Sequence, residues 1–254
     1  MEKHLSEYYK ELESKLQHID KIDYRDTLTS TQTIAKQLFH LNKGNFLIVA
    51  REQTESVGRF KREWKSPADG GFYGSFVFRE GVDKEKLPSF NLFISLALAE
   101  VFKYYTDDII IKWPNDLLLN GKKISGILTE IYTDNEDKAI ILGIGININR
   151  TRCTLLETAT TLEDITESKI SIPLFLSRLL VKIEKYYTLY LNESFSVVRD
   201  KYITYFNALG REFRITTNNE QFLGTAVDID EKGFLKVFDE SGKIRTIMSA
   251  DIEM

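Results

Sequence analysis

One stretch, residues 112–130, constrains the fold of this chain more than any other. The apolar run Ile109–Ile111 leads into it and is typical of a buried strand. Asn120 and Gly121 both tolerate positive φ, so together they are a strong hairpin signal. We therefore predict two short strands joined by a tight turn, at residues 117–119 and 124–130.

Charged side chains stand at fixed positions along this hairpin. They are Lys112, Asp116 and Lys123. Pro114 interrupts regular strand pairing between the first two, because proline has no N–H for the ladder. Charges on a rigid hairpin suit a small anionic ligand better than charges on a flexible loop. The neighbouring Lys122 is interpreted as an ordinary solvated lysine.

Composition excludes several classes of protein. A chain of 254 residues allows one large domain, or one large and one small, and 43% hydrophobic residues are ample for a packed core. The net charge of −4 gives no basic field for general nucleic-acid binding. A single cysteine, Cys153, excludes an internal disulfide framework and a Cys-rich zinc site, and we expect no metal ligands from the protein.

Two segments bear on whether the protein is exported or inserted into a membrane: the N-terminal residues and the most apolar window. The first residues lack the apolar core of a signal peptide. The most apolar window, residues 90–102, is too short to span a bilayer. We therefore expect a reduced, cytoplasmic protein that has no membrane partner.

Hydrophobic periodicity predicts further elements around the hairpin. Expected helices cover residues 1–19, a segment after Ser30-Thr31, and residues 88–105, 173–191 and 197–206. Expected strands cover residues 22–28, 46–50, 72–79 and 139–148. Residues 212–252 change to short alternating runs separated by turns such as Asn218-Asn219, which predicts a small β-barrel.

Three sequence blocks resemble the biotin protein ligase family. The first is Lys-Trp-Pro-Asn-Asp at 112–116, with Lys123 ahead of Gly-Ile-Leu at 126–128. The second is the loop from Gln53 to Pro67, which aligns without a gap on Gln53 and Trp64. The third is Gly-Ile-Gly-Ile-Asn at 143–147. Within the loop, Ser56, Val57 and Lys61 stand where the family has Gly, Arg and Gly.

The resemblance implies an α+β fold. Its main part is a mixed β-sheet packed with helices, of the class II synthetase-like biotin/lipoate ligase type, and it is followed by a small C-terminal SH3-like β-barrel. We expect a catalytic domain at residues 1–207, including the helix at 1–19, and the barrel at 208–254. This arrangement resembles the short form of the family, without a DNA-binding domain. In some members an Arg near the end of the barrel reaches the ATP site, and no Arg stands in the last residues here.

The resemblance also implies an activity. ATP and biotin would be substrates, with Mg²⁺, and would form biotinyl-5′-AMP. Biotin would then pass to a lysine of a biotin carboxyl carrier domain. The protein would be a monomer or a homodimer and would not bind DNA. Two alternatives stay open: a lipoate or octanoate ligase of the same superfamily, and a non-catalytic biotin-binding regulator.

Site residues follow from the same resemblance. Catalytic roles are implied for Lys123, Arg59 and Asp116. Biotin binding is implied for Ser30, Thr31, Gln32, Gln53, Gly58, Arg59, Tyr73, Lys123 and Gly126. Nucleotide binding is implied for Arg59, Arg62, Trp64, Lys112, Asn115, Asp116 and Asn147. The structural alternatives are that Ser30 or Thr31 caps a helix and that Trp64 belongs to the core.

Overall fold

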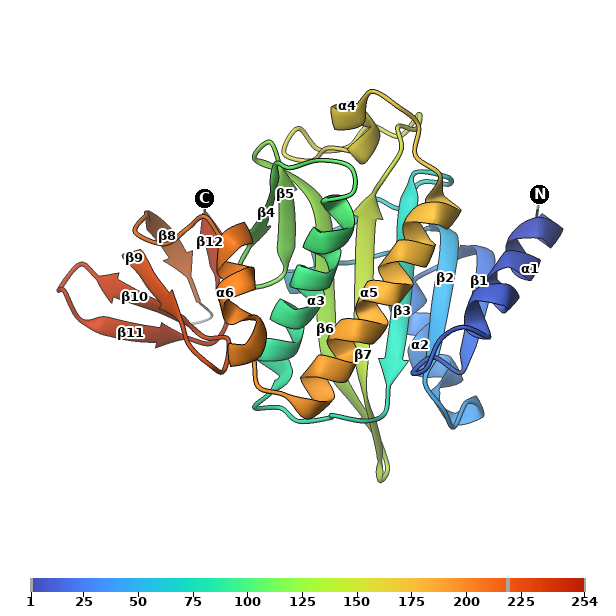
Figure 1. Cartoon of the computed structure of the whole chain (residues 1–254), viewed down its shortest axis with the longest axis horizontal. Helices are drawn as coiled ribbons and strands as arrows, with labels where there is room; N and C mark the ends of the chain where they lie inside the picture. Colours follow the sequence, from blue (N-terminus) through green and yellow to red (C-terminus); the bar gives the residue numbers. More distant parts are fainter. Residues whose placement is uncertain (1, 218–219, 254) are drawn as a thin grey trace.

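A seven-stranded mixed sheet forms the centre of the computed structural model, which describes residues 2–217 and 220–253 (Figure 1). The strand order is β1-β2-β3-β7-β6-β5-β4; β1 and β2 are parallel, and all other neighbours are antiparallel. The strands are β1 Lys21–Leu28, β2 Phe46–Gln53, β3 Gly71–Phe78, β4 Ile109–Lys112, β5 Asp116–Leu119, β6 Lys122–Asp134 and β7 Asp137–Asn147.

Helices cover the two faces of this sheet unequally. The helices are α1 Glu2–Glu13, α2 Thr31–Leu38, α3 Leu87–Phe102, α4 Leu162–Thr166, α5 Ile172–Asn192 and α6 Ser196–Tyr205, with short 3-10 turns at Phe39–Leu41 and Arg59–Lys61. Helices α3 and α5 lie side by side across one face (Figure 1). Helix α3 is buried nearly all round, as its sequence predicts. Helix α2 packs on the other face but covers only part of it.

Strand β3 shows how the sequence divides the two faces. Because side chains alternate along a strand, Phe72, Phe76 and Phe78 join the core under α3 and α5. Val77 points the other way, into the smaller cluster under α2. Ser75 also lies on that second face, beyond the cover of α2, and faces the cavity described below.

A five-stranded antiparallel sheet follows and packs against the helices and hairpin of the seven-stranded part. Its order is β11-β10-β9-β8-β12, from β8 Glu212–Thr216, β9 Gln221–Ile229, β10 Leu235–Asp239, β11 Ile244–Ile247 and β12 Asp251–Glu253. Its buried residues belong to the same hydrophobic core as α3. The Trp113 indole Nε1 donates to the Gly233 carbonyl at 3.1 Å, and the Arg199 Nε donates to the Ile229 carbonyl at 2.8 Å. The first bond ties the hairpin region to the C-terminal sheet, and the second ties α6 to it.

The predicted fold class is confirmed, with corrections at the ends of elements. The expectation of a helix over residues 1–19 is wrong, because α1 ends at Glu13. The Glu13 carboxylate accepts the Ile22 N–H at 2.8 Å, so the chain turns back there to begin β1. Helix α3 ends at Phe102 rather than residue 105, and strand β12 was not predicted. Met1 and the expected turn at Asn218-Asn219 lie outside the described residues.

Across residues 2–217 and 220–253, no helix combines the length and the apolar character that a membrane span requires.

The turn at Asn120-Gly121 gives the first testable prediction. Both residues have positive φ, 50° and 74°, and a Cβ added at Gly121 would meet no atom within 4 Å. Gly121→Ala should therefore lose about 1 kcal/mol of unfolding free energy through backbone strain alone. Urea denaturation measures this.

Gly58→Ala is the matched control, because Gly58 has φ −94° and its nearest atom would be 3.8 Å away. It should lose no stability. Equal midpoints for the Gly121→Ala variant and the wild type would contradict the strain argument.

Candidate active site

A cavity opens on the face of the sheet that α2 leaves uncovered. Its walls come from the start of α2, the loop between β2 and β3, the β4–β5–β6 hairpins, strand β7 and the segment before β12. Four cationic side chains line it: Arg59, Arg62, Lys112 and Lys123. Three acidic side chains line it as well: Glu63, Asp116 and Asp251. The local charge is therefore positive, although the whole chain carries −4.

Glycines on β7 give this cavity its floor. Gly143 and Gly145 alternate with Ile144 and Ile146, whose side chains lie in the core on the other face. A Cβ at Gly145 would lie 2.5 Å from the Trp64 indole, so the ring rests directly on the strand backbone. The Trp64 Nε1 is buried and has no hydrogen-bond partner among the described residues.

The polar end of the cavity surrounds the N-terminus of α2. Ser30 occupies the N-cap position, but its side chain makes no capping bond, contrary to the simple capping interpretation. Instead, the Thr31 N–H donates to the Gln53 Oε1 at 2.8 Å. The Gln53 Nε2 in turn donates to the Ser66 Oγ at 2.8 Å. Because Gln53 supplies the cap, the buried Ser30 hydroxyl is left for the cavity.

Lys123 is held more firmly than its neighbour Lys122. Its Nζ lies 2.7 Å from the Asp116 carboxylate and 5.5 Å from the Trp64 ring centre. Its backbone N–H donates to the Thr158 carbonyl at 2.8 Å, and its carbonyl accepts from the Thr160 N–H at 3.0 Å. Lys122 is exposed. The backbone contacts and the ion pair together fix one cation over the glycine floor.

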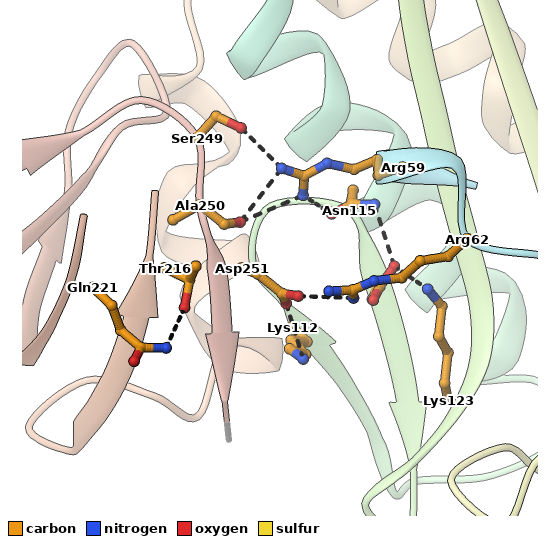
Figure 2. Close-up of polar contacts among 11 residues, drawn as sticks. Arg59, Arg62, Lys112, Asn115, Lys123, Thr216, Gln221, Ser249, Ala250 and Asp251 are labelled. Carbon is orange, nitrogen blue, oxygen red and sulfur yellow. Dashed lines mark hydrogen bonds and ion pairs between the residues drawn. The ribbon is translucent and has the colours of Figure 1, made fainter. Parts of the chain in front are cut away.

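Arg59 enters the same region from the loop (Figure 2). Its Nη1 donates to the Asn115 Oδ1 at 2.6 Å. Burial lowers the pKa of the Arg59 guanidinium from its ordinary value; Asp116 and Asp251 oppose this effect, and Arg62 adds to it. A partly desolvated guanidinium attracts an anion more strongly than one in bulk water, because less solvent screens the charge.

The C-terminal sheet also reaches the site (Figure 2). The Arg62 Nη1 donates to an Asp251 carboxylate oxygen at 2.8 Å, and the Lys112 Nζ lies 3.8 Å from Asp251. The Arg59 Nη2 donates to the Ser249 Oγ at 2.9 Å. The C-terminal sheet thus contributes a carboxylate and a hydroxyl to the site.

The loop itself folds into a short hairpin. The Gly58 N–H donates to the Arg62 carbonyl at 2.8 Å, and Phe60 and Lys61 have positive φ at its tip. The Ser56 hydroxyl donates to the Trp64 carbonyl, and it contacts the Ser66 hydroxyl at 2.9 Å. Ser56, one of the departures from the family pattern, therefore ties the base of this loop together.

Most of the predicted site residues line this one cavity. They are Ser30, Thr31, Gln32, Gln53, Gly58, Arg59, Arg62, Trp64, Lys112, Asn115, Asp116, Lys123 and Gly126. Tyr73 and Asn147 do not. They line a neighbouring cavity, where burial raises the pKa of Tyr73 and its hydroxyl donates to the Pro67 carbonyl at 3.2 Å.

Sequence reasoning missed several residues of the site. Ser75 lies in the predicted strand at 72–79 but was given no role, and Ser249–Asp251 carry no motif and contact residues about 190 positions away. Lys122 lines the second cavity, and the adjacent Lys123 lines the first. Among the described residues no cluster of three or more His, Cys, Asp or Glu could hold a metal ion.

Comparisons with known proteins agree with this geometry. Residues 24–147 match the Biotin/lipoate A/B protein ligase family, and residues 208–254 match the Biotin protein ligase C terminal domain. The chain is 35% identical over 241 residues to the Bifunctional ligase/repressor BirA of Bacillus subtilis, across 91% of this chain and 73% of that protein. It is 36% identical over 123 residues to the Biotin--[acetyl-CoA-carboxylase] ligase of Paracoccus denitrificans, across 47% of this chain and 51% of that protein.

A solved structure shares the fold over nearly its whole length. The biotin protein ligase from Aquifex aeolicus in complex with biotin and ATP superposes with a TM-score of 0.80 at 29% identity. The match covers 92% of this chain and 98% of that one.

The Ser56 contacts predict how easily the loop opens. Ser56→Ala removes the hydroxyl that joins the two sides of the loop base, so tryptic cleavage after Arg59, Lys61 or Arg62 should become about five- to tenfold faster. Limited proteolysis followed by mass spectrometry measures the rate at these sites.

Val57→Ala is the control, because that side chain is 51% exposed and carries no such bond. It should leave the cleavage rate unchanged. Cleavage of the Ser56→Ala variant at the wild-type rate would show that the hydroxyl does not hold the loop.

Proposed function

The chain belongs to the biotin protein ligase family, and we propose how its site carries out the ATP-dependent ligation of biotin to a protein. The observation that carries the proposal is the convergence of four cations from three separate elements on one cavity above a glycine floor. A carboxylate that attacks a polyphosphate must be screened from its repulsion, and fixed cations supply that screening.

The first step forms the adenylate. A biotin carboxylate oxygen bonds to the α-phosphorus of ATP, and the bond from that phosphorus to the bridging oxygen of pyrophosphate breaks. The products are biotinyl-5′-AMP and pyrophosphate. Lys123 faces the carboxylate and the α-phosphate, and Arg59 with Arg62 faces the phosphates. The support is that these side chains line the cavity and that Asp116 and Asn115 already hold two of them in place.

The second step transfers biotin. The uncharged amine of an acceptor lysine attacks the carbonyl carbon of the mixed anhydride, an amide bond forms, and AMP leaves with the electron pair of the broken C–O bond. Asp116 orients the reacting groups, because its carboxylate is half-buried beside Lys123. The described residues that line this cavity include no His or Cys, and the chemistry requires no covalent enzyme intermediate.

The nucleotide extends along the hairpins. Lys112 and Asn115 stand beside the arginines, and Trp64 offers a flat face at the cavity floor. We also assign a nucleotide contact to Asn147, which ends β7 two residues beyond Gly145 and borders the second cavity. Tyr73 borders that cavity too, so any effect of Tyr73 on biotin is exerted through its bond to Pro67.

Magnesium fits this site as a companion of ATP. Mg²⁺ keeps several waters and usually binds substrate phosphates with one or two carboxylates. Of the three acidic side chains in the cavity, Asp116 and Asp251 lie beside the phosphate-facing cations and would hold the ion, which departs from the expectation of no metal ligand from the protein. When bound, the ion neutralises phosphate charge.

The proposal also includes the domain boundaries, the acceptor, the location and the oligomeric state. We assign residues 1–207 to the catalytic domain and 208–254 to the C-terminal domain. The acceptor is a biotin carboxyl carrier domain, the location is the cytoplasm, and the protein acts as a monomer or homodimer. Lipoate ligation is the less favoured alternative, because residues 208–254 match a domain described for biotin protein ligases.

Two adjacent lysines give a direct test. Lys123→Ala should slow pyrophosphate release from biotin and ATP by at least about 100-fold, because it removes an oriented cation. Lys122→Ala should change the rate less than about threefold, because that side chain is exposed.

The measurement is pyrophosphate release without acceptor, at saturating biotin and ATP, with melting temperatures to verify folding. Equal rates for the two folded variants would refute the assignment of Lys123.

A further inference from the structure

We propose that Glu130 is a positioning residue that makes the polar end of the cavity accept hydrogen bonds and so selects an acid whose ring carries N–H donors. This rests on the proposed function, and it concerns a residue that does not itself line the cavity. Glu130 lies on β6, behind Gln32, and acts through that side chain.

The contacts of Gln32 fix the direction of its amide. Its Nε2 donates to the Glu130 Oε1 at 2.8 Å and lies 3.4 Å from the Ile141 carbonyl oxygen. Both partners can only accept, so the NH₂ group must face them. The Lys36 Nζ lies 2.8 Å from the same Glu130 oxygen, and this ion pair helps to hold the carboxylate in place.

The remaining hydrogen bonds follow from that direction. The Gln32 Oε1 faces the Ser75 hydroxyl at 3.0 Å and must accept its proton. Ser75 has only one proton, so Thr31 must be the donor in its 2.8 Å contact with the Ser75 oxygen. The donors therefore follow one direction: Thr31 donates to Ser75, Ser75 donates to Gln32, and Gln32 donates to Glu130.

The direction of this hydrogen-bond chain determines whether the cavity donates hydrogen bonds to a ligand or accepts them from it. The Thr31 and Ser75 hydroxyls each donate their proton to a neighbouring protein oxygen. The oxygens of Thr31, Ser75 and Gln32 can therefore only accept hydrogen bonds from a ligand. Ser30 alone among these neighbours has a hydroxyl without a hydrogen-bond partner in the described part of the chain, and it can donate. The cyclic urea of biotin carries two N–H donors and one carbonyl acceptor, which complements this set. The dithiolane of lipoate and the alkyl chain of octanoate carry no donors.

Gly143 provides the space for this arrangement. A Cβ at Gly143 would lie 2.7 Å from the Gln32 Oε1. The bare backbone at Gly143 therefore leaves room for the Gln32 amide and lets it reach Glu130.

The test measures biotin and ATP binding separately by titration calorimetry. Glu130→Gln keeps the shape but can donate as well as accept, so the Gln32 amide is free to flip. The dissociation constant for biotin should rise about tenfold, the effect of one misdirected buried hydrogen bond, and that for ATP should not change. Lys36→Gln should give a smaller rise in the same direction.

Asp134→Asn is the matched control. Asp134 lies four residues further along β6 and pairs with His40, without touching the cavity. This variant should bind biotin like the wild type.

A double-mutant cycle separates positioning from general loosening of the strand. In a Gln32→Met background, Glu130→Gln should have no further effect on biotin binding, because Glu130 acts only through Gln32. Additive losses would overturn the proposal, as would unchanged biotin binding in the Glu130→Gln variant or equal weakening of ATP. If the wild type itself fails to bind biotin, the proposed function fails instead.

Discussion

The alternation of side chains along β7 is the constraint on which the site depends. Ile144 and Ile146 bury their side chains under α3 and α5, while Gly143 and Gly145 face the opposite side. One strand can thereby bury apolar side chains in the core on one face and expose bare backbone to the cavity on the other. The helices cover the apolar face almost completely, whereas the glycine face is covered only in part: α2 reaches Gly143 through the Gln32 side chain, and the Trp64 ring lies on Gly145. The position of the cavity follows from this pattern.

Charge is arranged before any ligand arrives. Asp116 holds Lys123, Asn115 holds Arg59, and Asp251 holds Arg62 from the C-terminal sheet. Preorganised cations stabilise a developing negative charge without the cost of reorienting during the reaction. The same contacts connect the loop, the hairpin and the C-terminal sheet, so these polar bonds add to the shared hydrophobic core that joins the sheet to α3.

Local signals predicted the hairpin and the cation positions well, because Asn120-Gly121 sets its own turn and the spacing of Lys112 to Lys123 follows from it. Contacts between distant segments could not be predicted. Asp251 meets Arg62 across almost the whole chain, and no local pattern indicates it. The cap on α2 was missed for the same reason: Gln53 from the end of β2 reaches the Thr31 N–H, which composition near Ser30 does not reveal.

The most direct test of this account uses the wild-type chain with biotin, Mg-ATP and a biotin carboxyl carrier domain. Pyrophosphate release and the mass of the acceptor are measured in the same reaction. The account predicts one pyrophosphate for each acceptor that gains a single biotinyl group, at a lysine. A folded protein that binds biotin but yields neither product would contradict it.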